Sequence, residues 1–217
     1  MNTRIFVAGF LAAGLLASAI AQSAKPLYEN NFEKAELDKV PEDFLVLDGQ
    51  FAVKQEGDNR FLELPGAPLD TFGVLFGPTG KDEMMVSARI FGTAKGRRSP
   101  TFAVSLNGVG GYKLQVSAAK KQVELFKGEA VKTAVPFEWP SGKWTNFKLQ
   151  VRKSKDNEWK IEGRVWTEGD PEPAGWTVSF GETEEPSAGR AAVWGNPFSG
   201  TPIRFDDLKV AAVSNKP

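Results

Sequence analysis

Hydrophobic and polar residues alternate most clearly between positions 143 and 167. In the first half, Phe147, Leu149 and Val151 alternate with charged and amide side chains. A short turn of Ser, Lys, Asp and Asn follows, and the alternation resumes at Trp159. A period of two places successive side chains on opposite faces of a strand. The pattern therefore predicts two antiparallel strands of a sheet with one buried face.

Short strand-like runs continue along most of the chain, separated by turn residues. Gly and Asn in these breaks adopt the positive φ angles that tight turns require, and a turn is also expected at 78–80. No apolar stripe at helical spacing is sustained beyond the first 21 residues. Many short strands at this spacing predict an all-β chain folded as a two-sheet antiparallel jelly-roll sandwich in a single domain. Besides the two strands within 143–167, the predicted strands are 27–32, 44–47, 50–55, 61–64, 73–76, 84–91, 101–106, 112–117, 122–126, 177–180, 190–194 and 203–213.

The first 21 residues have the pattern of a secretory signal peptide. Arg4 precedes an apolar run of small residues, and Ala19-Ile20-Ala21 matches the A-x-A cleavage pattern before Gln22. The apolar run is shorter than the ~20 residues that a membrane span needs. We therefore expect residues 1–21 to be removed, residues 22–217 to form the domain, and the mature protein to be secreted or periplasmic without a membrane span.

Composition excludes several classes of chemistry. The chain has no Cys and no His, so disulfides, Cys or His nucleophiles, and zinc or copper sites of the usual ligand types are excluded. Its 27 basic and 27 acidic side chains balance, which gives no polybasic surface for nucleic acid or membranes. No nucleophile elbow, phosphate-binding glycine loop or dinucleotide fingerprint is present.

Five strand motifs occur along the chain: Trp144–Val151 (W-x-x-F-x-L-x-V), Val165-Trp166, Ala188–Trp194, Phe205–Val210 and Gly111–Val116. Together they resemble the concanavalin A-like lectin/glucanase superfamily, and within it the laminin-G-type and 3-keto-disaccharide-hydrolase-like jelly rolls exported by many bacteria. The resemblance implies two curved, stacked antiparallel sheets with a ligand groove on one face. The superfamily includes hydrolases, lyases, lectins and adhesion modules, so the fold leaves the function open.

One departure from the hydrolase branch concerns the strand that ends at Ser117. It continues with Ala118 and Ala119, where the resemblance would place an acidic residue. This difference argues against carrying that group's catalysis over to this chain.

The outward-facing positions of the strands form the candidate binding surface. Amide, guanidinium and carboxylate groups pair with sugar hydroxyls, and an aromatic face covers the apolar side of a pyranose ring. Trp166 and Trp194 are the tryptophans placed to act as such platforms. The alternative is an ordinary solvated face with cross-strand ion pairs. The candidate ligand-binding residues are Arg89, Gln115, Gln150, Arg152, Glu162, Arg164 and Trp166.

Two acidic motifs suggest other sites. Asp206, with Asn31 and the neighbouring Glu29 and Asp207, offers hard oxygen ligands for a structural calcium ion, as in related jelly rolls that join the first and last strands. The alternative is that an aspartate accepts backbone hydrogen bonds at the sheet edge. The E-x-D-x-E pattern at 168–172 resembles a glucanase triplet, but Gly and Pro intervene, so we expect a loop with carboxylates in water rather than a catalytic strand.

Three functions remain open. The leading hypothesis is an exported carbohydrate- or glycan-binding module, with no cofactor beyond the calcium ion and no nucleic-acid partner. The second is a glycoside-processing enzyme of the 3-keto-disaccharide-hydrolase type. The third is a non-catalytic scaffold for an unidentified protein partner.

Overall fold

The computed structural model describes residues 26–66 and 70–213, so the predicted signal peptide lies outside the described residues. Within this part the chain consists of fifteen β-strands and one 3-10 turn, Ala118–Lys120. No helix of the described residues is long and apolar enough to cross a membrane. The fifteen strands confirm the predicted all-β class.

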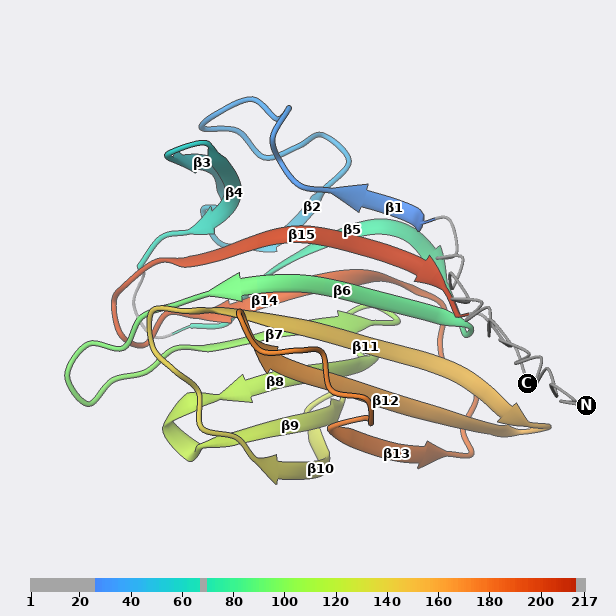
Figure 1. The fold of residues 1–217 in the computed structure, drawn as a ribbon. Helices are drawn as coiled ribbons and strands as arrows, with labels where there is room; N and C mark the ends of the chain where they lie inside the picture. The colour runs from blue at the N-terminus through green and yellow to red at the C-terminus, as the bar shows by residue number, and fades with distance from the viewer. Residues whose placement is uncertain (1–25, 67–69, 214–217) are drawn as a thin grey trace, which may run out of the picture.

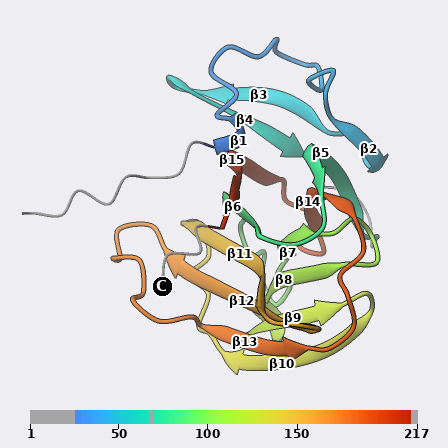
Figure 2. The same cartoon turned by 90° about the vertical axis from the view of Figure 1, so that its right-hand side faces the viewer.

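The strands form two stacked antiparallel sheets (Figures 1 and 2). The eight-stranded sheet, here sheet A, has the order β13 (Val178–Glu182), β12 (Glu158–Thr167), β11 (Trp144–Lys155), β6 (Met84–Phe91), β15 (Ile203–Ala212), β4 (Asn59–Leu64) and β3 (Ala52–Glu56), with β1 (Pro26–Asn30) also paired to β15. The seven-stranded sheet, here sheet B, has the order β10 (Ala130–Pro136), β9 (Gln122–Lys127), β8 (Tyr112–Ser117), β7 (Thr101–Leu106), β14 (Gly189–Asn196), β5 (Phe72–Gly80) and β2 (Leu45–Asp48).

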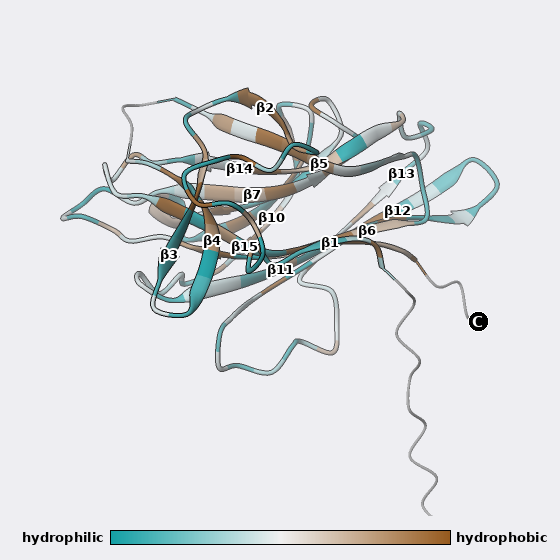
Figure 3. Ribbon diagram, turned by 90° about the horizontal axis from the view of Figure 1, so that it is seen from above, coloured by the Kyte–Doolittle hydropathy of each residue, from teal (hydrophilic) through white to brown (hydrophobic). Residues whose placement is uncertain are grey.

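The hydrophobic core fills the space between the two sheets. Seen from above, sheet B forms the upper layer with β14 and β7, and sheet A the lower layer with β11 and β6 (Figure 3). Buried side chains from both layers meet in one cluster that includes Phe102, Leu114, Phe147 and Phe205. Because each strand buries alternate residues, the residues between them point to the two outer surfaces. The outer surfaces are where a ligand can bind.

The hairpin predicted at 143–167 is present as β11 and β12, with Phe147 opposite Val165 in the register and both buried. The opposite face was expected to be either a binding surface or a solvated face with cross-strand ion pairs, but two of its polar residues are buried. Gln150 and Glu162 lie directly opposite each other and are only 7% and 5% exposed. Strands β6 and β13 flank the pair, and Gln150 donates to Glu162 at 2.8 Å.

Two strand predictions need correction. β10 was not predicted, because it is an exposed edge strand without regular alternation. The turn expected at 78–80 is instead part of β5. Pro78 fits there because β2 pairs with β5 only as far as Leu75, so no ladder hydrogen bond to β2 is lost at the proline.

Candidate functional site

The register of sheet B arranges its outward-facing residues in rows that run across the strands. Val104, Leu114 and Val193 point into the core and are fully buried, so their neighbours in sequence point outward. Adjacent members of each row are paired in the register. From β5 to β9, the rows are Leu75, Ala192, Ser105, Lys113 and Phe126; then Gly73, Trp194, Ala103, Gln115 and Glu124; and, from β14 to β9, Asn196, Thr101, Ser117 and Gln122.

A groove follows these rows. It consists of two adjoining cavities of about 310 and 380 Å³ that share Thr71 and Lys113 in their walls. The residues paired with Trp194 are Gly73 and Ala103. Because both are small, no long side chain fills the groove at this point. The first cavity is also lined by Ser105, Gly108 to Gly111, Gly128, Glu129 and Trp194, and the second by Ser99, Thr101, Gln115, Ser117, Ala119, Lys120, Phe126, Asn196 and Phe198.

The Trp194 side chain lies against the sheet and spans three strands. On one side, a Cβ added to Gly73 of β5 would come within 2.4 Å of Cε3 of the indole. On the other side, Nε1 donates to Oγ of Ser105 on β7 at 2.7 Å. With both edges of the ring held by neighbouring strands, one ring face covers the sheet and the other faces the groove. The groove therefore has a flat, fixed aromatic surface.

Hydrogen-bonding side chains surround this surface. Gln115 donates through Nε2 to Oγ of Ser117 at 2.9 Å, and the Ser117 hydroxyl donates to the carboxylate of Glu124. Glu124 is 3% exposed and also accepts from Nζ of Lys120 at 2.9 Å. These contacts hold the amide, hydroxyl and carboxylate groups in fixed positions.

The third row continues the polar lining toward β14. Thr101 donates through its hydroxyl to Oδ1 of Asn196 at 3.0 Å, and Nδ2 of Asn196 donates to Oγ1 of Thr71 at 2.5 Å. The groove thus presents fixed hydroxyl and amide groups beside an aromatic face.

Gln115 is the one predicted ligand-binding residue that lines this groove. The other six lie on the outer surface of sheet A, on β6, β11 and β12, where several pair with one another. Arg152 donates to Glu162 at 2.8 Å. Burial raises the pKa of Glu162, but the hydrogen bonds from Arg152 and Gln150 lower it by more, so its pKa lies below the ordinary value.

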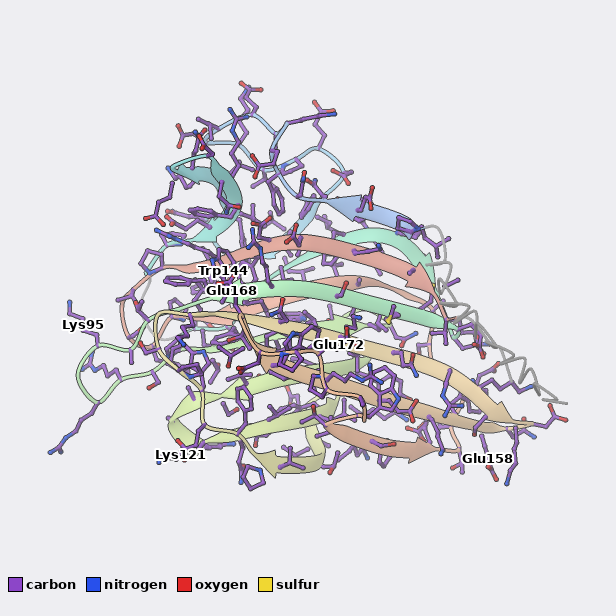
Figure 4. All side chains as sticks on the ribbon, viewed as in Figure 1. Lys95, Lys121, Trp144, Glu158, Glu168 and Glu172 are labelled. Atoms are coloured by element: carbon purple, nitrogen blue, oxygen red, sulfur yellow. The ribbon has the colours of Figure 1, made fainter. Side chains whose placement is uncertain are left out.

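A loop between β12 and β13 folds over this surface of sheet A, and Figure 4 shows Glu172 in front of the β11–β12 hairpin. Glu172 pairs with Lys148 at 2.5 Å and with Arg164 at 2.7 Å. The Arg164 guanidinium also lies 4.2 Å from the ring centroid of Trp176. The E-x-D-x-E pattern is a loop as expected, but the expectation that its carboxylates extend into water is wrong for Glu172.

Lys148 also contacts the predicted platform Trp166. Its Nζ lies 5.8 Å from the Trp166 ring centroid, so one cation joins the loop carboxylate and the indole. The polar groups of this surface are largely used in contacts within the protein.

Arg89 stands at the centre of a charged cluster on the same surface. Its Nη2 lies 2.6 Å from Oδ2 of Asp206, and its guanidinium lies 4.6 Å from the ring centroid of Trp144. Arg89 forms further ion pairs with Asp207 at 2.9 Å and Glu168 at 3.6 Å, and Figure 4 shows Glu168 beside Trp144. Asp206 is 1% exposed; burial raises its pKa, and the Asp207 amide and Arg89 offset part of that rise.

The two residues predicted to bind calcium, Asp206 and Asn31, do not line the same cavity. The carboxylate of Asp206 accepts hydrogen bonds from Arg89, Asn59 and the Asp207 amide. Asn31 instead lines a separate cavity of about 920 Å³, together with Glu29 and Asp207 but not Asp206. Among the described residues, no three acidic side chains are grouped so that they could hold a metal ion. The calcium site stays a prediction.

Most residues of the groove were not identified from the sequence. Alternation alone indicated that Gln115 faces outward, and Trp194 was recognised as a platform position. The pairing of β7 with β14, which are far apart in sequence, is needed to bring Trp194 beside the polar rows. Thr101, Ser117, Lys120, Glu124 and Asn196 become recognisable only with that register.

Comparison with known proteins gave structural matches only. No family model and no curated protein sequence matches the chain. The carbohydrate binding module CBM66 from Bacillus subtilis matches with a TM-score of 0.56 and 14% identity over 78% of this chain and 96% of that one. A protein of unknown function with a galectin-like fold, also from Bacillus subtilis, matches with a TM-score of 0.58 and 11% identity over 87% and 98%.

A catalytic domain also shares the fold. The glycoside hydrolase family 131 protein from Coprinopsis cinerea matches with a TM-score of 0.55 and 10% identity over 89% of this chain and 95% of that domain. The structural neighbours thus include a carbohydrate-binding module, a galectin-like protein and a glycoside hydrolase. At sequence identities this low, the similarity shows a shared fold alone.

Proposed function

Because the chain folds as a concanavalin A-like lectin/glucanase sandwich, we propose that it binds a carbohydrate in the groove on the outer surface of sheet B. The observation that carries this proposal is the Trp194 indole, which lies flat on the sheet between Gly73 and Ser105. A fixed aromatic face with polar groups at its rim is the arrangement that sugar rings require.

The chemistry of the groove matches the two kinds of surface on a pyranose. The apolar C–H face of the ring stacks on the Trp194 indole, and the hydroxyl groups point outward from it. Gln115, Asn196 and Thr101 supply amide and hydroxyl groups that can donate or accept at those positions. Because Thr101 donates to Asn196 and Gln115 donates to Ser117, little side-chain entropy remains to be lost on binding.

The outer surface of sheet A fits this role less well. Its arginines and glutamates are paired within the protein, as Arg152 is with Glu162 and Arg164 with Glu172. A sugar would have to compete with those ion pairs and with the loop that carries Glu172. We therefore place the site on sheet B, although six of the candidate residues lie on sheet A.

Binding is better supported than turnover. Glycoside hydrolysis generally uses two carboxyl groups that flank the scissile bond. Among the described residues that line the groove, Glu129 is the one carboxylate. The nearby Glu124 is buried and is held by Ser117 and Lys120. We expect a bound oligosaccharide to stay intact during prolonged incubation with the protein.

We also propose that the protein acts outside the cytoplasm. The support is the signal-peptide pattern of residues 1–21, with Arg4, the apolar run and the Ala19-Ile20-Ala21 cleavage motif. Binding of cell-surface or environmental polysaccharide is consistent with that location.

A glycan-array screen of the purified protein tests the proposed function. We expect a small, chemically related set of glycans to bind, because the groove has fixed polar groups rather than a featureless apolar wall. The screen is repeated with calcium and with chelator, which also tests the predicted structural ion. An array with no bound glycan, confirmed with soluble polysaccharides, would contradict the proposal.

A further inference from the structure

Lys113 lies where the two cavities of the groove meet and lines both. Its Nζ lies 4.8 Å from the ring centroid of Phe126. In the part of the chain that the structure describes, no carboxylate lies within ion-pair distance of it. Burial lowers the pKa of Lys113, while Glu124 and Glu129 act in the opposite direction. A partly buried ammonium without a partner is electrostatically unsatisfied.

A second group of cations borders one end of the groove. Between β6 and β7, the chain turns at Gly96, whose φ is 62°. Lys95 and Arg98 exchange backbone hydrogen bonds of 2.9 and 3.2 Å across this turn. The tip of the hairpin carries Lys95, Arg97 and Arg98, all exposed, and Figure 4 shows Lys95 projecting away from the body of the protein. Arg98 is followed directly by Ser99, which lines the groove.

Among the described residues, no acidic side chain near the groove forms an ion pair with these cations. Glu124 is paired with Lys120, and Asp70 accepts a hydrogen bond from the Thr71 amide at 2.7 Å. Glu129 lies in the cavity at the far end, beside the β7–β8 turn, away from the hairpin. The free charge at the hairpin end and at Lys113 is therefore positive, although the whole chain is neutral.

We infer that the carbohydrate bound in this groove is acidic, with carboxylate or sulfate groups that contact Lys113 and the hairpin cations Lys95, Arg97 and Arg98. This inference rests on the proposed function and names the class of ligand. Lys113 would meet an acidic group of the sugar beside Trp194. The hairpin would attract the next charged units of an extended chain, since exposed cations act on a polyanion over a Debye length of about 10 Å.

The experiment compares matched pairs of soluble polymers by calorimetry. Polygalacturonate is compared with its methyl ester, and dextran sulfate with dextran, so that each pair differs in charge. We expect at least one acidic member to bind about tenfold or more tightly than its neutral counterpart, because hydrogen bonds to charged groups are stronger than neutral ones. Affinity should fall as the salt concentration rises.

Variants separate the specific contact from general attraction. Lys113→Gln should weaken binding of the acidic polymer about tenfold, whereas Lys160→Gln, which removes an exposed lysine from sheet A, should leave it unchanged. The double variant Arg97→Gln/Arg98→Gln should weaken it about threefold at low salt, because exposed charges contribute less. Trp194→Ala should also weaken binding of the same polymer. This result would show that the polymer binds in the groove.

Each other outcome overturns the inference. Equal or tighter binding of the neutral polymers, with loss of affinity in Trp194→Ala but not in Lys113→Gln, refutes the acidic ligand and leaves the proposed groove intact. Binding of acidic polymers that is insensitive to Trp194→Ala is general charge attraction and refutes both proposals. Binding of no acidic polymer refutes the inference, and the array screen then decides the proposed function separately.

Discussion

Replacing Trp194 with alanine is expected to weaken glycan binding by about thirtyfold, equivalent to roughly 2 kcal/mol, the loss typical of a central aromatic binding residue. The substitution removes the flat surface that lies between Gly73 and Ser105. Calorimetry with the glycan found in the screen measures the change. Because Trp194 is partly exposed, the protein should stay folded, which a thermal melt checks.

Two companion variants make this result specific. Trp194→Phe keeps an aromatic face but loses the hydrogen bond from Nε1 to Ser105, so binding should be weakened less than in the alanine variant. Trp166→Ala removes the tryptophan predicted as a platform on sheet A and should leave affinity unchanged. If Trp166→Ala weakens binding and Trp194→Ala does not, the site lies on sheet A instead.

Replacing Arg89 with glutamine is expected to lower the free energy of unfolding by about 3 kcal/mol, because it leaves a buried carboxylate without its cation. Asp206 is almost completely buried, and the Arg89 Nη2 lies 2.6 Å from its Oδ2. The variant also loses the stacking of the guanidinium on Trp144. Urea unfolding at neutral pH measures the loss, and glycan affinity should be unchanged if Arg89 acts only in stability.

The pH dependence of the Arg89→Gln effect follows from the pKa of Asp206. Burial already raises this pKa above its ordinary value, and removing Arg89 should raise it further. A carboxyl whose pKa is higher in the folded chain favours folding when protonated, and this contribution is lost as the pH rises through the folded pKa. The difference in unfolding free energy between Arg89→Gln and the natural chain should therefore be smaller at pH 4 than at pH 7.

The double variant Arg89→Gln/Asp206→Asn is the control for this explanation. Removing the carboxylate charge as well should restore part of the lost stability. It should also remove the pH dependence of stability that titration of Asp206 causes in Arg89→Gln. A loss below about 1 kcal/mol in Arg89→Gln, or a loss that does not vary with pH, would show that the pair is no more important than a surface ion pair.

Alternation along single strands was enough to predict most of the fold. Phe147, Leu149 and Val151 are fully buried as predicted, because a period of two has only one consistent solution when one face packs on a core. The same reasoning failed for β10, an exposed edge strand with no buried face to reveal its period. It also failed at Pro78, where β2 no longer pairs with β5, so the proline costs no ladder hydrogen bond to β2.

The candidate site was harder to predict because it depends on which strands are neighbours. Trp194 and Ser105 are distant in sequence, and their hydrogen bond exists because β14 lies between β5 and β7. Alternation assigns a residue to a face, but it does not say which sheet carries its strand. Gln115 and Gln150 both face outward, yet they lie on opposite sides of the molecule.

Burial of polar groups was the other feature that alternation did not capture. Glu162 was expected to face outward, as a ligand-binding residue or in a cross-strand ion pair, and it forms such a pair with Arg152 but is buried. Glu172 was expected to extend into water, and it is paired with Arg164. Such networks depend on side-chain length and on the path of the loop after β12. They remove much of the surface of sheet A from consideration as a binding site.

The most direct test of the sheet B groove is an NMR titration of the isotope-labelled protein with the bound glycan. The account predicts that the indole N–H of Trp194 and the backbone amides of Thr101–Leu106 and Tyr112–Ser117 shift with increasing glycan, while those of Trp144–Lys155 and Glu158–Thr167 do not. Shifts confined to the β11–β12 hairpin, with the Trp194 indole unaffected, would contradict it.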